Sequence, residues 1–183
     1  MERDQEVALV ERLRAGDTAA FDVVYDTYRA RLYGYLVRLS RRSEVAEDLL
    51  EETWLRLVAH AARLDPATHL APWLFTVARR LFMSYCRSRG IEDHALVTGA
   101  ALGTLRDPSP SPHDLAVTDE SVRRVEQAIA RLPVSDRDVL LLVSADGLAP
   151  GEAAAACGIR ADAFRQRLAR ARARLERELD GRR

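Results

Sequence analysis

The chain has 183 residues, of which 48% are hydrophobic, 31% charged and only 6% aromatic, as expected for a globular protein with cores of aliphatic side chains. Its formal net charge is zero, so overall basicity does not point to nucleic acid. We expect no signal peptide, no membrane insertion and no structural zinc site, because the N-terminus is highly charged, no apolar run approaches about 18 residues, and Cys86 and Cys157 stand far apart.

The distribution of charge is more informative than its total. All 28 basic residues are Arg, which the base composition of a GC-rich genome would explain, although Arg also binds phosphate and guanine well. Residues 1–90 have a net charge of +1, residues 91–120 of −5 and residues 121–183 of +4. These differences predict three parts with separate roles.

In the first part of the chain, residues 4–88 are periodic and nearly free of Gly and Pro. Apolar residues recur at spacings of three and four, which indicates amphipathic helices. Asp17 or Thr18 can cap the second helix and Ser43 the third. We predict four helices, at about residues 4–15, 18–40, 44–63 and 71–88.

The middle part has a different character. It is acidic, lacks helical periodicity and carries Pro108, Pro110 and Pro112 at alternate positions. Such a composition is typical of a flexible, partly polyproline linker, which we place at residues 91–118. Its scattered apolar residues leave open that parts of it dock elsewhere.

The last part, residues 119–183, is again helical. Ser135 and Asp138 form a capping-box-like pair, and Gly158 lies in a tight turn. Helices are predicted at about residues 119–131, 136–144, 150–156 and 161–179. The fold class is therefore all-α, with two small four-helix domains, at 1–90 and 119–183, joined by the linker.

A short helix, a turn containing Gly and a longer helix form the layout of a helix-turn-helix. In the longer helix, Phe164, Leu168, Ala171 and Leu175 lie on one stripe, while Arg occupies the other faces. Residues 160–183 have a net charge of +5. A solvated Arg-rich helix would look similar, but together with the Gly-containing turn the pattern favours DNA binding.

The residues of this region also resemble a known family. The segment GLAPGEAAAACGIRADAFRQRLARARARL resembles the promoter-binding C-terminal domain of sigma-70 family factors of the extracytoplasmic-function (ECF) group. The resemblance is carried by Glu152, by Gly158 and by the run from Arg167 to Arg172. The preceding segment AIARLPVSDRDVLLLVSADGL resembles the first half of the same domain.

The front part resembles the family independently. AEDLLEETWLRL at 46–57 is similar to its polymerase-docking helix, and PWLFTVARRLFMSYCRSR at 72–89 to its promoter-melting and −10-reading helix. Several positions, among them Arg80, Ser84 and Gln166, depart from the usual family residues where bases are read. The resemblance therefore implies the architecture but not the promoter sequence.

By resemblance, the acidic helix binds a basic coiled coil of the polymerase's largest subunit. Acidic groups speed the encounter and an apolar anchor supplies affinity. A solvated acidic face beside a core Trp is the alternative. The expected polymerase-binding residues, with Glu47 as a possible addition, are Asp48, Glu51, Glu52, Trp54 and Leu55.

Melting of the promoter is expected at the fourth helix, where residues 72–90 carry four Arg and no acidic residue. Basic charge holds a separated strand, and aromatic surfaces such as Phe75, Phe82 and Tyr85 could receive unstacked bases. Trp73 is more simply a core residue, in line with Val77 and Leu81. The expected −10 and melting residues are Arg79, Arg80, Met83, Ser84 and Arg87.

The helix-turn-helix is expected to bind the −35 element of duplex DNA. Arg165 and Gln166 lie where base edges can be reached, Arg170 can reach a base or a phosphate, and Arg172 and Arg174 suit phosphates. The expected set is Arg165, Gln166, Arg167, Arg170, Arg172 and Arg174. The acidic linker would lie in the polymerase's RNA path by resemblance, or serve as a plain tether.

The chain is thus expected to be an ECF-type sigma factor, cytoplasmic and nucleoid-associated, that acts with core RNA polymerase and promoter DNA and is held by an anti-sigma factor. No catalytic constellation stands out, so we expect no enzyme activity, cofactor, metal or small-molecule substrate. The alternatives are a helix-turn-helix regulator that acts without core polymerase and a helical interaction protein without a DNA role.

Overall fold

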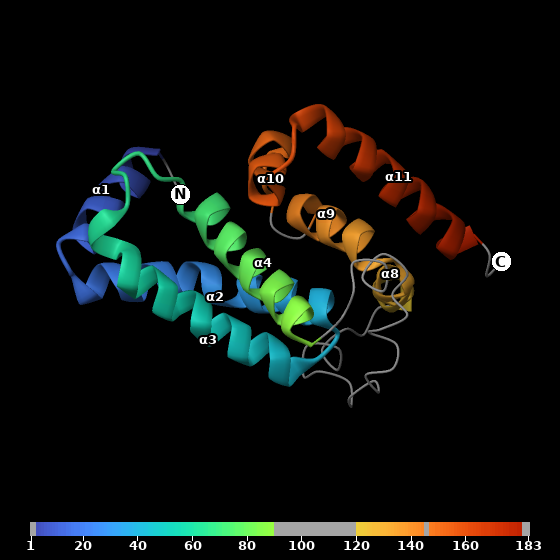
Figure 1. Ribbon diagram of the computed structural model, residues 1–183, viewed down its shortest axis with the longest axis horizontal. Coiled ribbons are helices and arrows are strands. Elements are labelled where there is room, and N and C mark those ends of the chain that lie inside the picture. Colours follow the sequence, from blue (N-terminus) through green and yellow to red (C-terminus); the bar gives the residue numbers. More distant parts are fainter. Residues whose placement is uncertain (1–2, 90–119, 145–146, 181–183) are drawn as a thin grey trace.

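The computed structural model describes residues 3–89, 120–144 and 147–180, and within these ranges it is helical without a strand (Figure 1). None of the helices described there is both long and apolar enough to cross a membrane. The elements are α1 (Arg3–Arg14), α2 (Thr18–Ser40), α3 (Ser43–His60), the 3-10 turn η1 (Ala61–Arg63), α4 (Leu70–Ser88), α8 (Glu120–Arg131), α9 (Val134–Ser144), α10 (Pro150–Cys157) and α11 (Ala161–Asp180).

The predicted all-α fold is confirmed, and the predicted helices appear with small shifts at their ends. The largest shifts are in α3, which ends at His60 before the 3-10 turn, and in α9, which begins at Val134. Asp17 caps α2 as expected, because its Oδ1 accepts hydrogen bonds from the backbone N–H groups of Ala19 at 2.9 Å and Ala20 at 3.3 Å. The predicted linker, 91–118, lies outside the described residues, so the domain boundaries stay a prediction.

The first helix set, α1 to α4, is built around α2. Helix α3 packs along α2, and α4 packs against both. The face that α4 buries differs from the expected one. Phe75 and Phe82 are fully buried, so neither is available to receive an unstacked base. The stripe predicted for the core is only partly buried: Trp73, Val77 and Leu81.

The second helix set, α8 to α11, contains the predicted helix-turn-helix. Gly158 ends α10 in the left-handed region at φ 66°, which favours glycine. Phe164, Leu168 and Ala171 bury the expected stripe of α11. The capping box predicted for α9 is wrong, because Asp138 lies inside the helix and its carboxylate binds side chains of the first helix set.

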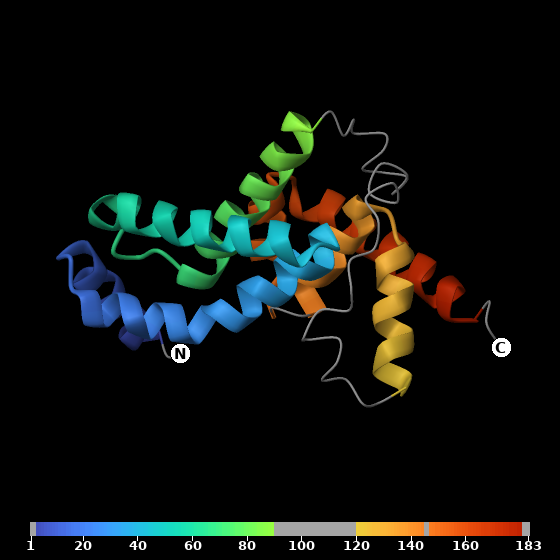
Figure 2. The same cartoon turned by 90° about the horizontal axis from the view of Figure 1, so that it is seen from below.

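The two helix sets pack directly against each other. Helix α10 contacts α4, and α9 contacts α2 (Figures 1 and 2). Their buried apolar residues form one continuous cluster. The linker prediction allowed this arrangement but did not require it, since contacts between residues far apart in the chain leave no local periodic pattern.

Candidate polymerase- and DNA-binding surfaces

The exposed face of α3 is acidic. Asp48 and Glu51 are exposed, and Glu52 is partly covered by Arg56, whose Nε donates to it at 2.7 Å one helical turn away. Leu55 lies on the same helix with 56% of its surface exposed. The structure therefore leaves predicted acidic residues and one apolar side chain of α3 exposed to solvent.

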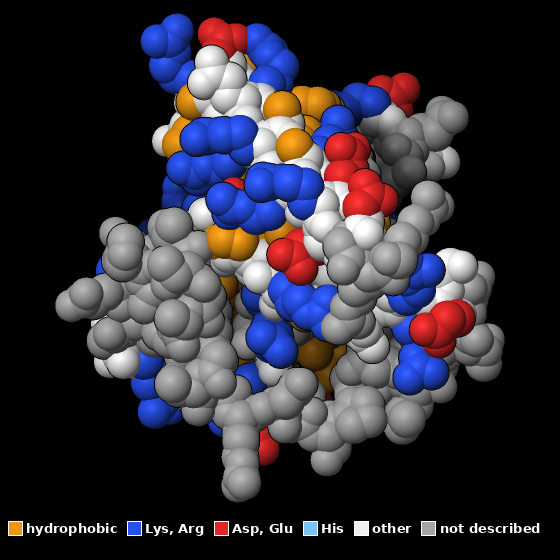
Figure 3. Space-filling model, turned by 90° about the vertical axis from the view of Figure 1, so that its right-hand side faces the viewer, with side chains coloured by type: hydrophobic (Ala, Val, Ile, Leu, Met, Phe, Trp, Pro, Cys, Tyr) orange, Lys and Arg blue, Asp and Glu red, His pale blue; other side chains and the backbone are white. Residues whose placement is uncertain are grey.

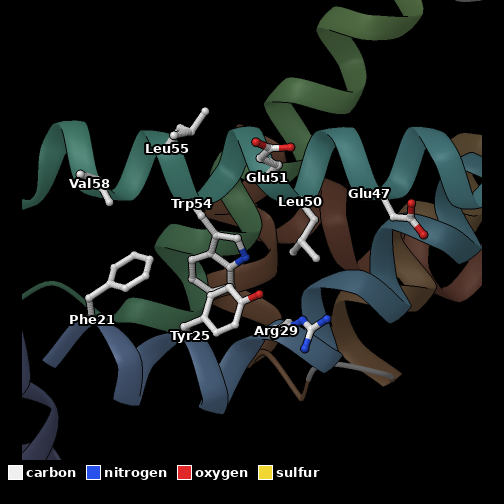
Figure 4. Close-up of a pocket in the computed structure, with 9 residues that line it drawn as sticks. All are labelled: Phe21, Tyr25, Arg29, Glu47, Leu50, Glu51, Trp54, Leu55 and Val58. Carbon is white, nitrogen blue, oxygen red and sulfur yellow. The ribbon is translucent and has the colours of Figure 1, made fainter. Parts of the chain in front are cut away.

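Trp54 has a different position from its predicted neighbours. Its side chain is 7% exposed and packs on Tyr25, with 5.0 Å between ring centroids, and edge-on against Phe21. In Figure 4 it points from α3 toward α2, while Leu55 points away. Trp54 thus forms the inner wall of a groove, and Leu55 is the exposed apolar contact.

This groove between α2 and α3 adds residues that the sequence analysis missed. The Nε1 atom of Trp54 is buried and has no hydrogen-bond partner among the described residues. Phe21, Tyr25 and Arg29 of α2 line up at intervals of four, the one sequence signal that could have located them. The lining residues are Phe21, Tyr25, Arg29, Glu47, Leu50, Glu51, Trp54, Leu55 and Val58.

Helix α4 presents part of its predicted DNA-binding set to solvent. Arg80, Ser84 and Arg87 are exposed and follow one another at spacings of four and three, so they lie on one ridge. Met83 is partly buried against the core. The ridge exposes two guanidinium groups to solvent.

Arg79, which was predicted to contact the promoter, is engaged inside the protein. Its side chain is 16% exposed, and its Nε donates to Asp138 Oδ2 at 2.7 Å. Although burial opposes the charged form, the nearby Asp138 carboxylate raises the pKa of Arg79 above its usual value. In this arrangement Arg79 is an ion-pair partner within the protein and does not reach DNA.

The other oxygen of Asp138 accepts a hydrogen bond from Tyr35. The distance from the Tyr35 hydroxyl to Oδ1 is 2.8 Å, and both side chains are buried. Burial, and then the Asp138 carboxylate, raise the pKa of Tyr35 well above its usual value, so the hydroxyl remains a donor. Sequence reasoning missed this triad, because Tyr35 looked like one more apolar position and Asp138 like a cap.

Arg137 is a second buried contact between the helix sets, with 1% of its surface exposed. One terminal nitrogen donates to the Leu39 carbonyl at 3.0 Å, and the other to the Ala130 and Leu132 carbonyls at 2.9 and 3.0 Å. These carbonyls lie at the C-terminal ends of α2 and α8, where backbone acceptors lack helical partners. Burial, followed by repulsion from Arg41, lowers the pKa of Arg137 to about 10.

On α11 the predicted DNA-binding residues divide into three rows. With about 3.6 residues per turn, Gln166 and Arg170 lie opposite the buried stripe, and both are exposed. The two flanks are formed by Arg165 with Arg172 and by Arg167 with Arg174. Arg side chains gather in the upper part of Figure 3, at the height that α11 has in Figure 1.

Two of these Arg residues already have acidic partners. Arg165 forms an ion pair with Asp162 on the surface of the same helix. Arg174 donates to Asp136 Oδ2 at 2.5 Å, within the second helix set. Arg167 is only partly exposed. The freest candidates for DNA are therefore Gln166, Arg170 and Arg172, all of them exposed.

Comparison with known proteins agrees with this division into two helix sets. The family model for Sigma-70 region 2 matches residues 24–91, and that for Sigma-70 region 4 matches residues 122–175. The first match covers most of α2, α3 and α4, and the second covers the helix-turn-helix with the helices before it.

Similar proteins extend over nearly the whole chain. The chain is 35% identical over 147 residues to the ECF RNA polymerase sigma factor EcfG of Rhodopseudomonas palustris, covering 79% of this chain and 76% of that protein. It is 31% identical over 173 residues to the RNA polymerase sigma factor CarQ of Myxococcus xanthus, covering 94% and 95%. The chain therefore belongs to the ECF group of sigma-70 family RNA polymerase sigma factors.

Solved structures show the same fold. The sigma factor RpoE of Bartonella quintana, in complex with the anti-sigma factor NepR, matches with a TM-score of 0.70 and 26% identity, over 89% of this chain and 98% of that one. CnrH, in complex with the cytosolic domain of CnrY, matches with a TM-score of 0.71 and 20% identity, over 96% and 97%. The second likeness concerns the fold alone.

Proposed function

We propose that this chain joins core RNA polymerase through α3, separates and reads the −10 element with α4, and reads the −35 element with α11. The observation that carries the proposal is the match of the chain, region by region, to ECF sigma factors. Exposed charge on three separate helices supports the assignment of roles. The chain itself would perform no catalysis, and the polymerase would supply the chemistry.

Docking would use the acidic face of α3 together with the groove behind it. Asp48 and Glu51 attract a basic partner, and exposed Leu55 supplies apolar area. A Leu55→Asp variant would weaken binding to core polymerase more than Glu52→Gln, because Glu52 is already paired with Arg56.

DNA recognition would be divided between the two helix sets. The −10 strand would lie along the ridge of Arg80, Ser84 and Arg87, and duplex upstream DNA would lie on the outer face of α11. Guanidinium groups bind phosphates on both surfaces, whereas Gln166 and Arg165 can contact base edges. Arg79 would join the −10 surface only after leaving Asp138.

A reconstituted transcription assay tests the proposal. Purified chain, core polymerase and a library of randomised promoters are expected to give run-off transcripts from a defined class of promoters. Core polymerase alone serves as the control. Tight binding of duplex DNA without polymerase and without transcripts would favour a helix-turn-helix regulator, and neither activity would favour an interaction protein.

We also propose regulation by an anti-sigma factor in the cytoplasm, where the polymerase works. The support is the fold shared with the Bartonella quintana sigma factor RpoE, which was solved in complex with the anti-sigma factor NepR. Co-purification from the native host is expected to recover an inhibitor that abolishes run-off transcription. Activity that stays constant across conditions, with no inhibitor recovered, would contradict this part of the proposal.

A further inference from the structure

The Asp138 carboxylate lies where the two helix sets meet, with 1% of its surface exposed. Both of its oxygens are used: Oδ1 accepts from the Tyr35 hydroxyl at 2.8 Å and Oδ2 from Arg79 Nε at 2.7 Å. Tyr35 and Arg79 both belong to the first helix set, and Asp138 belongs to the second. A buried charge needs such partners, so the three side chains favour close contact between the sets.

The contact also occupies a residue suited to DNA. Arg79 precedes Arg80, the first residue of the exposed ridge of α4. A guanidinium group binds a carboxylate and a phosphate with the same donors. While Asp138 accepts from its Nε and its side chain is 16% exposed, Arg79 cannot serve a promoter phosphate.

Two further contacts hold the same junction. Arg137, next to Asp138, donates across it to the carbonyls of Arg38 and Leu39 at the end of α2. At its edge, Arg38 Nε donates to Glu126 of α8 at 2.9 Å, and both side chains remain partly exposed. Of these three contacts, the Asp138 contact is the one that takes a side chain from the candidate −10 surface.

We propose that Asp138 acts as an internal substitute for promoter phosphate, holding the two helix sets closed in the free chain and releasing Arg79 only when they separate. The inference rests on the proposed function, because it concerns the availability of the −10 surface. Opening of the junction is then a step before promoter binding. If only a fraction of the molecules is open at any time, the apparent affinity for DNA is reduced by that fraction.

The test compares two Asp residues of α9. Asp138→Asn keeps the size of the side chain but removes the charge that pairs with Arg79 across the junction. Asp136→Asn is the matched control, because Asp136 pairs with Arg174 within the second helix set. Tyr35→Phe removes one hydroxyl and serves as a second junction variant should Asp138→Asn fail to fold by circular dichroism.

Two measurements on the full chain are decisive: the radius of gyration from small-angle X-ray scattering, and the anisotropy of fluorescein-labelled single-stranded DNA of mixed sequence. For Asp138→Asn we expect a larger radius of gyration and DNA binding about tenfold tighter than for the unmodified chain. This factor corresponds to an unmodified chain in which the closed form outweighs the open form by about ten to one. Tyr35→Phe is expected to change both in the same direction but less. Asp136→Asn is expected to match the unmodified chain.

Equal radius and DNA affinity in the folded junction variants and the unmodified chain would overturn the inference, as would equal opening by Asp136→Asn. Run-off transcription by the unmodified chain with core polymerase is measured separately. Transcripts there support the proposed function whatever Asp138→Asn does, and their absence counts against that function without changing what the scattering data say about the junction.

Discussion

Helices α4 and α11, the two proposed DNA-binding helices, both carry Arg side chains, but they differ in how many of these side chains are exposed. On α11, Gln166, Arg170 and Arg172 are exposed, and the acidic partners of its other Arg residues belong to the same helix set. On α4, Arg79 pairs with Asp138 of the other helix set. Similar Arg clusters therefore differ in the charge that they expose, according to the position of their nearest acidic group.

The largest expected effect tests whether both helices belong to one cooperative unit. Phe75 of α4 and Phe164 of α11 are each fully buried, so Phe75→Ala and Phe164→Ala should each lower the free energy of unfolding by about 3–5 kcal/mol. Because one apolar cluster joins the helix sets, both variants should shift a single urea transition followed by circular dichroism.

Val58→Ala is the control for these substitutions, since Val58 is 60% exposed and its truncation should cost no more than about 0.5 kcal/mol. Two separate transitions, each moved by only one of the Phe variants, would mean that α4 and α11 unfold independently. The two helix sets would then be separate domains whose contact does not make them unfold together.

The next largest loss of unfolding free energy is expected when the Arg137 side chain is removed. Arg137→Ala leaves the Leu39, Ala130 and Leu132 carbonyls without their donor and opens a cavity, so a loss of about 3 kcal/mol of unfolding free energy is expected. Urea midpoints measure it, with exposed Arg131→Ala as the control. A loss below about 1 kcal/mol would show that water replaces the guanidinium at little cost.

Substitutions of two Arg residues on one flank of α11 should affect DNA binding in different ways. Arg165→Ala should reduce discrimination between the selected −35 sequence and a scrambled one by about 1–3 kcal/mol, because a base contact is lost. Arg172→Ala should weaken both complexes equally and lower the salt dependence of binding by about one counterion. Anisotropy with duplex DNA over a range of salt concentrations measures both, and identical behaviour of the variants would refute the assignment.

A smaller effect is expected from the thiol at the α4–α10 contact. Burial, followed by the Asp138 carboxylate, raises the pKa of Cys157 from the usual thiol value of 9.0 to about 12. Above pH 9 the unfolded chain therefore binds fewer protons, and stability falls as pH rises toward 12. By pH 10 the loss should be about 1 kcal/mol relative to Cys157→Ala in urea titrations, and parallel pH curves for the two proteins would contradict it.

The smallest expected effect concerns the edge of the junction. Arg38 and Glu126 form an ion pair at 2.9 Å, with 23% and 27% of their side chains exposed. Glu126→Gln should cost about 0.5 kcal/mol and leave the radius of gyration unchanged. If this variant opened the chain as far as Asp138→Asn, the edge pair would be as important as the buried carboxylate.

Several features of the site followed from local sequence alone. The stripe of Phe164, Leu168 and Ala171 places Gln166 and Arg170 outward whatever the helix packs against. The same holds for Asp48 and Glu51 on α3, which the structure leaves exposed. The exposure of these residues could be predicted because helical periodicity is a property of neighbouring residues, whereas their binding roles stay predictions.

Other features required the packed structure. On α4 the sequence analysis chose Trp73 for the core and left Phe75 and Phe82 as candidates for base stacking, whereas the structure buries both Phe side chains. Helix α4 has apolar residues on more than one face, so its periodicity does not select the buried one. The groove around Trp54 was missed for a similar reason, because it forms only where α2 and α3 pack.

The helices, the outward row of α11 and the acidic face of α3 could be read from local sequence, since each depends on residues within a few turns of one another. By contrast, the packing of distant helices was needed to reveal that Arg79 binds Asp138, 59 positions further along the chain, and that Tyr35 binds the same carboxylate across 103 positions. Such pairings arise when packing excludes water from side chains that the chain alone leaves far apart, and a buried charge then takes whichever partners lie within reach.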